Sequence, residues 1–218
     1  MTETTTTSAT YDRIASNYAA QWSDKVAILA RQRAQFMALL PPHARVLDVG
    51  CGPGHDAAQF RSHGLRACGL DRSRGMLREA QARAALPLLL GDMRCLPFAD
   101  GTFDGLWVSA SFLHIPKRDN LAVLCEMRRV LRPDGVLYIG VKQGHGERYV
   151  SDKEGQQRFF VFYQDDELDA LLEHAGFVVR VRRRDDDTLG REPWLNRFVE
   201  KSNTQQTSMS FRAGEPQS

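Results

Sequence analysis

The stretch that decides the fold is Val46-Leu47-Asp48-Val49-Gly50-Cys51-Gly52-Pro53-Gly54. Its first four residues form a short apolar run, which is typical of a buried parallel strand. Glycines then stand at positions 50, 52 and 54, where they let the backbone turn sharply and let a ligand approach closely. A helical stretch follows to about residue 63. A GxGxG loop alone is often only a tight turn, so its surroundings decide how it is interpreted.

An acidic residue after the next strand supports ligand binding at this loop. Residues 65–70 form a second strand-like run, and Asp71 follows it. Its separation from Gly50 is close to the roughly 20 residues expected for a carboxylate that binds ribose hydroxyls. The sequence therefore indicates a nucleoside-containing cofactor. A nicotinamide dinucleotide is disfavoured, because the GxGxxG fingerprint requires glycine or alanine where this chain has His55.

Strand and helix signals alternate along most of the chain. The expected strands are residues 46–49, 65–70, 86–90, 103–108, 136–141, 177–182 and 194–200. The expected helices are residues 11–40, 55–63, 73–85, 120–131 and 165–175. This order predicts an α/β fold with a doubly wound, mostly parallel seven-stranded sheet and helices on both faces. Pro87 predicts that its strand lies at a sheet edge, and the last two strands predict an antiparallel hairpin.

The length of 218 residues suits one domain, which we expect over residues 9–202. Residues 1–8 and 203–218 are polar and are predicted to be disordered tails. Within the domain, residues 9–40 predict a helical lid. Residues 142–163 interrupt the alternation with a polar half and an aromatic half, which predicts a mobile flap on the acceptor side. The alternative is a short strand that anchors the final helix.

Composition narrows the class of partners. The net charge is +2, without the strong basic excess typical of proteins that bind nucleic acid. The four cysteines contain no CxxC pair, so we expect free thiols and no metal site. The threonine-rich start is unlike a signal peptide, and residues 86–90 are too few to cross a bilayer. We expect a cytoplasmic monomer or homodimer that binds neither nucleic acid nor membrane.

Five segments of residues 44–141 together carry a family resemblance. They are Val46-Leu47-Asp48-Val49-Gly50-Cys51-Gly52-Pro53-Gly54, Gly69-Leu70-Asp71, Gly91-Asp92-Met93-Arg94-Cys95-Leu96-Pro97-Phe98, Phe103-Asp104-Gly105-Leu106 and Arg129-Val130-Leu131-Arg132-Pro133-Asp134-Gly135-Val136-Leu137. In their order and spacing the chain resembles the class I S-adenosylmethionine-dependent methyltransferases. The similar subgroup includes the ubiquinone/menaquinone-type and many small-molecule methyltransferases. The resemblance implies a Rossmann-like fold and S-adenosyl-L-methionine as the cofactor.

The resemblance also implies roles for residues near the glycine loop. The backbone of Gly50, Cys51, Gly52 and Gly54 would border the methionine moiety. Asp48 would help to hold its ammonium group through water, although Asp48 also suits a helix cap.

Further roles concern the nucleoside and the lid. Asp71 would bind the ribose, Arg72 and Met76 would pack beside the adenine, and Asp92 and Met93 would contact the adenine. Ser109 would lie near the sulfonium, and Tyr11 and Tyr18 would contact the methionine carboxylate or close the site. For Met76, Asp92 and the tyrosines, ordinary packing or turn formation are the alternatives.

Methyl transfer from a sulfonium needs mainly in-line alignment and the exclusion of water. A general base is needed only where the acceptor must lose a proton. His114 follows the fourth strand, at the ligand-binding edge of such sheets, and its ordinary pKa suits neutral pH. A structural loop histidine is the alternative. The resulting hypothesis is methyl transfer to a small-molecule acceptor, and the alternative is a non-catalytic S-adenosylmethionine-binding regulatory partner of another enzyme.

Overall fold

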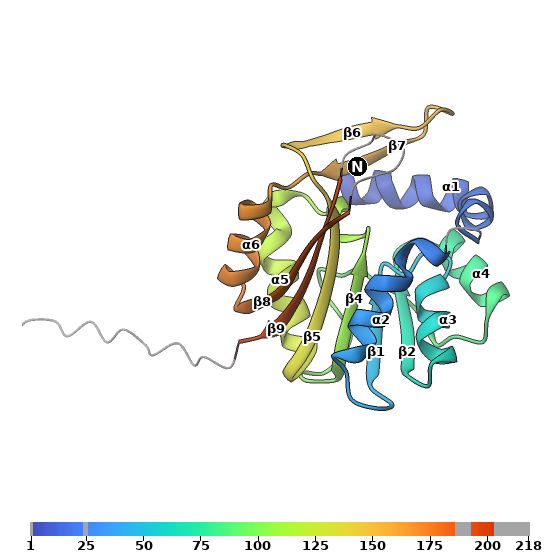
Figure 1. The fold of residues 1–218 in the computed structure, drawn as a ribbon. Coiled ribbons are helices and arrows are strands. Elements are labelled where there is room, and N and C mark those ends of the chain that lie inside the picture. Colours follow the sequence, from blue (N-terminus) through green and yellow to red (C-terminus); the bar gives the residue numbers. More distant parts are fainter. Residues whose placement is uncertain (1, 24–25, 186–192, 203–218) are drawn as a thin grey trace, which may run out of the picture.

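The computed structural model describes residues 2–23, 26–185 and 193–202. Its main sheet has seven strands in the order β3-β2-β1-β4-β5-β9-β8 (Figure 1). The strands are β1 (Arg45–Val49), β2 (Arg66–Asp71), β3 (Leu88–Leu90), β4 (Phe103–Ser109), β5 (Leu131–Lys142), β8 (Phe177–Asp185) and β9 (Trp194–Lys201). The first five run parallel, and β9 is antiparallel to both β5 and β8. The predicted mostly parallel sheet, the edge position of β3 and the terminal hairpin are confirmed.

Helices cover both faces of the sheet. The helices of the described residues, of which α1 lies across one end of the sheet, are α1 (Glu3–Ser23), η1 (Val26–Leu29), α2 (Ala30–Ala38), α3 (His55–Ser62), α4 (Arg74–Arg83), η2 (Phe112–His114), η3 (Lys117–Asp119), α5 (Asn120–Val130) and α6 (Asp165–His174). On one face, Phe36 of α2 and Phe60 of α3 pack on Trp107 of β4. On the other, α5 and α6 bury Leu124 and Leu168 against the sheet. The apolar strands are thus enclosed on both sides, as parallel strands require.

The N-terminal helix begins at Glu3, so the prediction of a disordered tail over residues 1–8 was wrong for residues 3–8. Threonine is a poor helix former, but tertiary contacts override that propensity here. Thr7 and Thr10 are buried. The Thr7 hydroxyl accepts a hydrogen bond from the Phe159 N–H at 2.9 Å, and the Thr10 hydroxyl donates to the Gln157 carbonyl at 2.7 Å. The other predicted tail, residues 203–218, lies outside the described residues.

A second, two-stranded sheet is formed by β6 (Glu147–Ser151) and β7 (Gln157–Val161). Residues 159–163 are all buried, and the Tyr163 hydroxyl lies 2.8 Å from the side-chain amide of Asn120 on α5. This part of the segment is therefore a strand that anchors its surroundings, as the alternative interpretation expected. The mobility of residues 142–163 stays a prediction.

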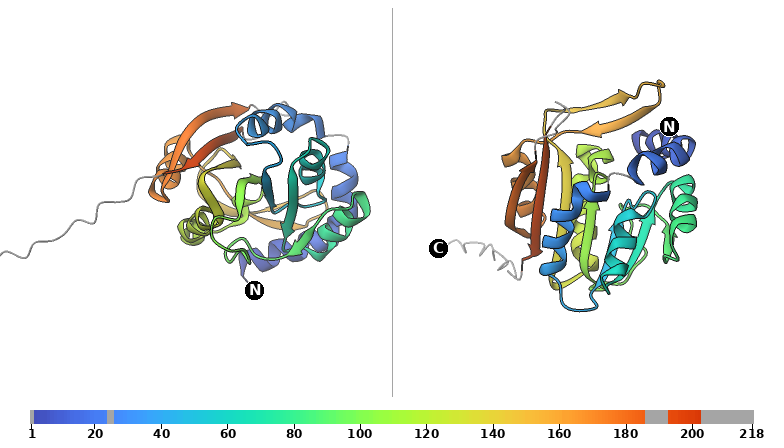
Figure 2. Two further views of the ribbon diagram at one scale, coloured as in Figure 1. Left: turned by 90° about the horizontal axis from the view of Figure 1, so that it is seen from below. Right: turned by 45° about the vertical axis from the view of Figure 1, so that its right-hand side comes forward.

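The hairpin β6–β7 and helix α1 lie together across one end of the main sheet (Figures 1 and 2). Helix α1 packs on α4 and on β7, and β7 packs on η2. Because α4 follows the end of β2 and η2 follows the end of β4, these elements cover the carboxyl ends of the parallel strands. That is the edge at which open α/β sheets bind ligands.

Candidate functional site

The glycine loop between β1 and α3 has a conformation that other residues rarely adopt. Gly50, Gly52 and Gly54 have φ angles of +73°, +51° and +75°. A Cβ atom on Gly50 would lie 2.3 Å from the Cβ of Ser111, so the loop there is held against the segment after β4. A Cβ on Gly52 would meet nothing within 4 Å. The loop therefore combines a tight anchor with an open side along which a ligand can approach.

Asp71 at the end of β2 is tied to this loop. Its Oδ2 accepts a hydrogen bond from the Gly52 N–H, and its Oδ1 accepts one from the Ser73 N–H, both at 2.8 Å. Burial raises the pKa of the Asp71 carboxyl, although these hydrogen bonds oppose the shift. A carboxylate has about four acceptor positions. The arrangement therefore fits a group with two adjacent hydroxyls, such as a ribose.

Asp48 of β1 lies beneath the start of α3. It is 3% exposed, and its Oδ2 accepts a hydrogen bond from the Ala57 N–H at 3.2 Å. Burial, reinforced by the negative charge of Asp56, raises the pKa of the Asp48 carboxyl well above its ordinary value. The structure thus gives Asp48 the helix-capping contact that was its alternative interpretation. Its predicted role toward an ammonium group stays a prediction.

Asp92 is held by two arginines. Its Oδ2 lies 2.7 Å from both a terminal nitrogen of Arg72 and one of Arg94. Burial alone would raise the pKa of Asp92, but the hydrogen bonds from Arg94 and the charge of Arg72 outweigh it, and the pKa lies below its ordinary value. An adenine amino group therefore has to share this carboxylate with the arginines or displace one. The roles of Asp92 and Arg72 toward adenine stay predictions.

Two methionines and Cys51 fill the space around the loop. Met93 is 9% exposed, and its Cε would lie 3.7 Å from a Cβ on Gly50. Met76 is 1% exposed, and Cys51 packs on Gly69, with burial raising the pKa of its thiol. Met76 thus has the core position that was its alternative interpretation. Its contact with adenine stays a prediction.

His114 in η2 is joined to the N-terminal helix. Its Nδ1 lies 2.6 Å from the Phe159 carbonyl oxygen, and its Nε2 lies 2.8 Å from the Tyr11 hydroxyl. Because a carbonyl accepts only, Nδ1 carries the proton and Nε2 of the neutral ring accepts from Tyr11. Burial, with the nearby charges of Arg158 and Lys142, lowers the pKa of His114 to about 4. The expectation of a pKa suited to neutral pH was therefore wrong, because sequence alone did not reveal the burial.

Tyr11 and Tyr18 share one face of α1, as their spacing predicted. Their rings meet edge to face at 5.6 Å, and the Tyr11 ring meets that of His114 at 5.4 Å. Both tyrosines thus lie on the inner side of the covering helix. Ser109, by contrast, ends β4, where it pairs with Gly140 of β5. The roles of the two tyrosines and of Ser109 toward a cofactor stay predictions.

Sequence reasoning missed the way in which α1 docks. Oδ1 of Asp12 accepts hydrogen bonds from the Ser73 hydroxyl and the Gly75 N–H at the start of α4, both at 2.8 Å. The partners are 61 and 63 residues away in the chain, and no local pattern marks them. Asp12 thus supplies an acceptor to the first turn of α4 and fixes the covering helix beside Asp71.

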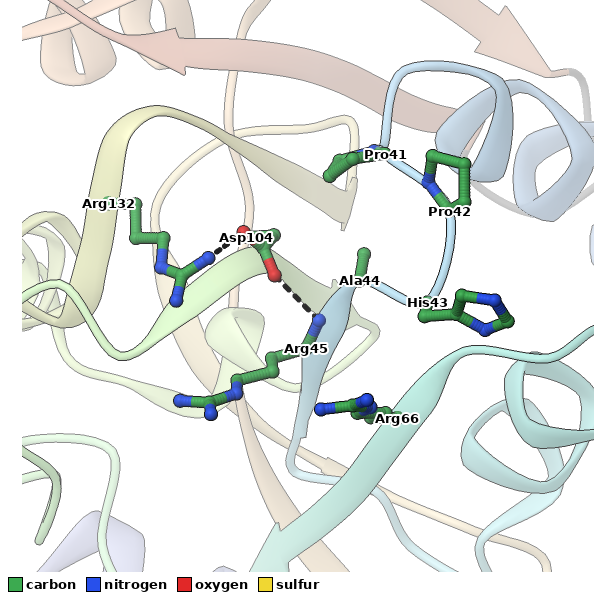
Figure 3. Close-up of a pocket in the computed structure, with 8 residues that line it drawn as sticks. All are labelled: Pro41, Pro42, His43, Ala44, Arg45, Arg66, Asp104 and Arg132. Atoms are coloured by element: carbon green, nitrogen blue, oxygen red, sulfur yellow. Dashed lines mark hydrogen bonds and ion pairs between the residues drawn. The ribbon is translucent and has the colours of Figure 1, made fainter.

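A pocket shown in Figure 3 lies at the other end of the sheet. It is lined by Pro41, Pro42, His43, Ala44, Arg45, Arg66, Asp104 and Arg132. Arg45 and Arg66 begin β1 and β2, whereas the glycine loop and Asp71 lie at the opposite ends of these strands. This pocket is therefore separate from the candidate site.

Within residues 2–23, 26–185 and 193–202, no cluster of three or more His, Cys, Asp or Glu side chains is placed to bind a metal ion. The described helices include none with the length and apolar character needed to cross a membrane.

Comparison with known proteins identifies the part of the chain that carries the glycine loop. Residues 46–135 match a family described as "Methyltransferase domain". This match supports the resemblance of the chain to the class I S-adenosylmethionine-dependent methyltransferases. Among solved structures, the fold resembles 1,6-didemethyltoxoflavin-N1-methyltransferase of Burkholderia thailandensis with a TM-score of 0.76. That likeness, at 23% identity, covers 91% of this chain and 88% of the other.

Curated members of the family match over part of their length. Methyltransferase GfsG of Streptomyces halstedii is 43% identical over 103 residues, or 44% of this chain and 36% of the relative. O-methyltransferase resE of Aspergillus sclerotiorum is 32% identical over 148 residues, or 62% of this chain and 54% of the relative. Malonyl-[acyl-carrier protein] O-methyltransferase of Enterobacter lignolyticus is 40% identical over 111 residues, or 49% of this chain and 43% of the relative. The chain thus spans about half or less of the length of these relatives.

Proposed function

We propose that this chain binds S-adenosyl-L-methionine at the carboxyl edge of its sheet and transfers the methyl group to a small-molecule acceptor. The observation that carries the proposal is the hydrogen bond from the Gly52 N–H to the Asp71 carboxylate. The left-handed Gly52 leaves open space above the loop, and its N–H holds the Asp71 carboxylate at the rim of that space. An acid so placed is suited to ribose hydroxyls, and the glycine loop is suited to close approach by the adjoining chain of the cofactor.

The bound cofactor supplies an activated methyl group on a sulfonium. The chain has to hold the two reactants in line and keep water away. The covering elements are suited to the second task, because α1 and β7 pack on each other over the strand ends. The Tyr11–His114 pair on the inner side of these elements is fixed by a hydrogen bond and is suited to holding the reactants in line.

His114 acts in this proposal chiefly by position. With a pKa of about 4 it is neutral at pH 7, and its Nε2 is already occupied by the Tyr11 hydroxyl. An imidazole with so low a pKa is a weak base, and it accelerates proton abstraction little at neutral pH. We infer that His114 orients Tyr11 and that alignment of the acceptor accounts for most of the catalysis.

The names of the relatives support a small-molecule or acyl acceptor. They include demethylmenaquinone and malonyl-[acyl-carrier protein] methyltransferases, and the similar Burkholderia structure contains bound 1,6-didemethyltoxoflavin and S-adenosylhomocysteine. These acceptors differ from one another in chemistry. They therefore support the reaction class and leave the methylated atom to experiment.

The test is methyl transfer from S-adenosylmethionine labelled in its methyl group. Purified protein is incubated with this cofactor and a metabolite extract, and label in new products is followed together with S-adenosylhomocysteine. We expect both to form only when protein and extract are present. Binding of the cofactor without turnover in any extract would favour the non-catalytic regulatory alternative. Absence of binding would contradict the proposal itself.

A further inference from the structure

Arg158 on β7 has one unsatisfied guanidinium nitrogen. Its Nε is buried and has no hydrogen-bond partner, and Arg158 forms no ion pair within the described part of the chain. Its neighbours are aromatic: the guanidinium carbon lies 5.5 Å from the ring centre of Tyr11 and 5.6 Å from that of Phe160. A cation is thus held against two rings without a carboxylate to balance it.

The surroundings of Arg158 are electropositive. Lys142, at the end of β5, lies 5.6 Å from the same Phe160 ring centre on which Arg158 packs. The charges of Arg158 and Lys142 both contribute to lowering the pKa of His114, whose ring lies 4.7 Å from that of Phe160. A negative charge also reaches this region from β2, because Asp71 adds to the effect of burial in raising the pKa of Tyr11. The site therefore offers positive charge beside apolar ring surface.

Burying part of the Arg158 guanidinium in this way costs free energy when no ligand is bound. A buried donor without an acceptor loses its interactions with water and gains nothing in return. Contacts with aromatic faces offset part of the cost of burying the charge. Because buried polar groups are almost always paired, an unpaired one at a ligand-binding edge indicates a missing partner. For a planar guanidinium, the partner of best geometry is a carboxylate bound through two hydrogen bonds.

The position of the cluster separates it from the expected cofactor site. The glycine loop follows β1 and Asp71 ends β2, whereas His114 follows β4 and Lys142 ends β5. The sheet order β2-β1-β4-β5 places these two pairs of strand ends side by side. A cofactor bound over the ends of β1 and β2 therefore has a cluster of side chains beside it, on the side of β4 and β5, where an acceptor would enter. The cluster consists of Arg158, Lys142, Phe160 and Tyr11.

We propose that Arg158 binds a carboxylate group of the acceptor and so selects acidic acceptors. This inference rests on the proposed function, because it takes the cofactor to lie over β1 and β2. Arg158 keeps partial exposure, which leaves a route to its guanidinium. Phe160 and Tyr11 then offer apolar surface to the part of the acceptor next to the carboxylate.

The test measures carboxylate selectivity directly and does not depend on turnover. Protein saturated with S-adenosylhomocysteine is titrated with matched acid and amide pairs, benzoate against benzamide and phenylacetate against phenylacetamide, and binding is followed by NMR. The wild type is expected to prefer each acid by about 10- to 100-fold, the range for a charge-assisted hydrogen bond. Arg158→Gln is expected to lose the preference, and Arg158→Lys to keep part of it. Arg148→Gln, which removes an exposed arginine of β6 that stacks on Phe162, is expected to keep it.

Two results would overturn the inference. One is an equal response to acid and amide in the wild type, including no response to either. The other is a preference that survives in Arg158→Gln. A further arm compares S-adenosylhomocysteine with 5′-methylthioadenosine, which lacks the amino-acid carboxylate. If Arg158→Gln weakens only the former, the carboxylate belongs to the cofactor and the acceptor assignment is wrong. Failure of S-adenosylhomocysteine to bind the wild type would instead contradict the proposed function.

Discussion

The Tyr11 hydroxyl donates a hydrogen bond of 2.8 Å to Nε2 of His114 and so joins the first helix to the loop after β4. The partners are 103 residues apart in the chain. The other ring nitrogen of His114 is bound to the backbone of β7, so one imidazole connects three elements. These elements are α1, η2 and the hairpin, which together cover the candidate site. The closed arrangement therefore depends on a neutral His114.

Removal of the Tyr11 hydroxyl is expected to destabilise the protein. In Tyr11→Phe, Nε2 of His114 stays buried and loses its donor, at a cost of about 1–3 kcal/mol. Denaturant unfolding measures the change in the free energy of unfolding. The matched control is Tyr149→Phe, since Tyr149 is exposed on β6. Equal stability of the two variants would mean that the Tyr11–His114 hydrogen bond is not formed in solution.

The burial of His114 predicts a pH dependence of stability. Its pKa is about 4 in the folded protein and 6.5 in the unfolded chain, so the unfolded state binds the proton first. Its contribution is thus fully present above pH 6.5 and is lost as the pH falls toward 4. The loss amounts to about 3 kcal/mol at 1.36 kcal/mol per pKa unit.

The measurement compares unfolding of the wild type and His114→Gln between pH 7 and pH 4. Acidic groups also titrate in this range. The contribution of His114 is therefore the difference between the two proteins in the unfolding free energy that each loses. We expect the wild type to lose more stability than His114→Gln on acidification. His63→Gln, which alters an exposed histidine, should follow the wild type. Parallel curves for wild type and His114→Gln would show that His114 titrates normally.

A methyl group on Gly75 is expected to loosen the covering helix. In Gly75→Ala the new Cβ would lie 2.8 Å from the Asp12 carbonyl oxygen and 3.0 Å from the Ala15 Cβ. Since these contacts belong to α1, the helix has to move away. Amide hydrogen exchange over residues 3–23 is expected to become faster, while exchange in β1 and β4 stays slow. Arg78→Ala, on the exposed side of α4, serves as the control. Unchanged exchange in α1 would mean that the two helices are not in contact.

The proposed flap makes a prediction about exchange in the hairpin. Residues 143–157 include the exposed strand β6, whereas residues 159–163 are buried. We expect fast amide exchange over residues 143–157 in the free protein, slowed by cofactor and acceptor together. Strong protection there without any ligand would show that the hairpin is fixed scaffold.

The sequence was informative where function depends on local spacing. The glycine loop, Asp71 and the alternation of strands and helices follow from neighbouring residues, and the sheet was predicted with its edge strand and terminal hairpin. The helix from Glu3 was missed because its stability comes from β7, about 150 residues away. The docking of Asp12, the low pKa of His114 and the unpaired Arg158 were missed for the same reason. Each depends on burial or on contacts that only the folded chain creates.

The most direct test of the central claim is the binding of S-adenosylhomocysteine by calorimetry to the wild type, Asp71→Asn and the control Asp166→Asn. Asp166 is an exposed acid on α6, far along the chain from the glycine loop. We expect micromolar binding to the wild type and the control, and no binding of NAD. Asp71→Asn is expected to bind at least about tenfold more weakly, because a hydrogen bond to a charged group is worth roughly 1.5–3 kcal/mol. Equal affinity of a folded Asp71→Asn and the wild type would contradict the assignment of this edge of the sheet as the cofactor site.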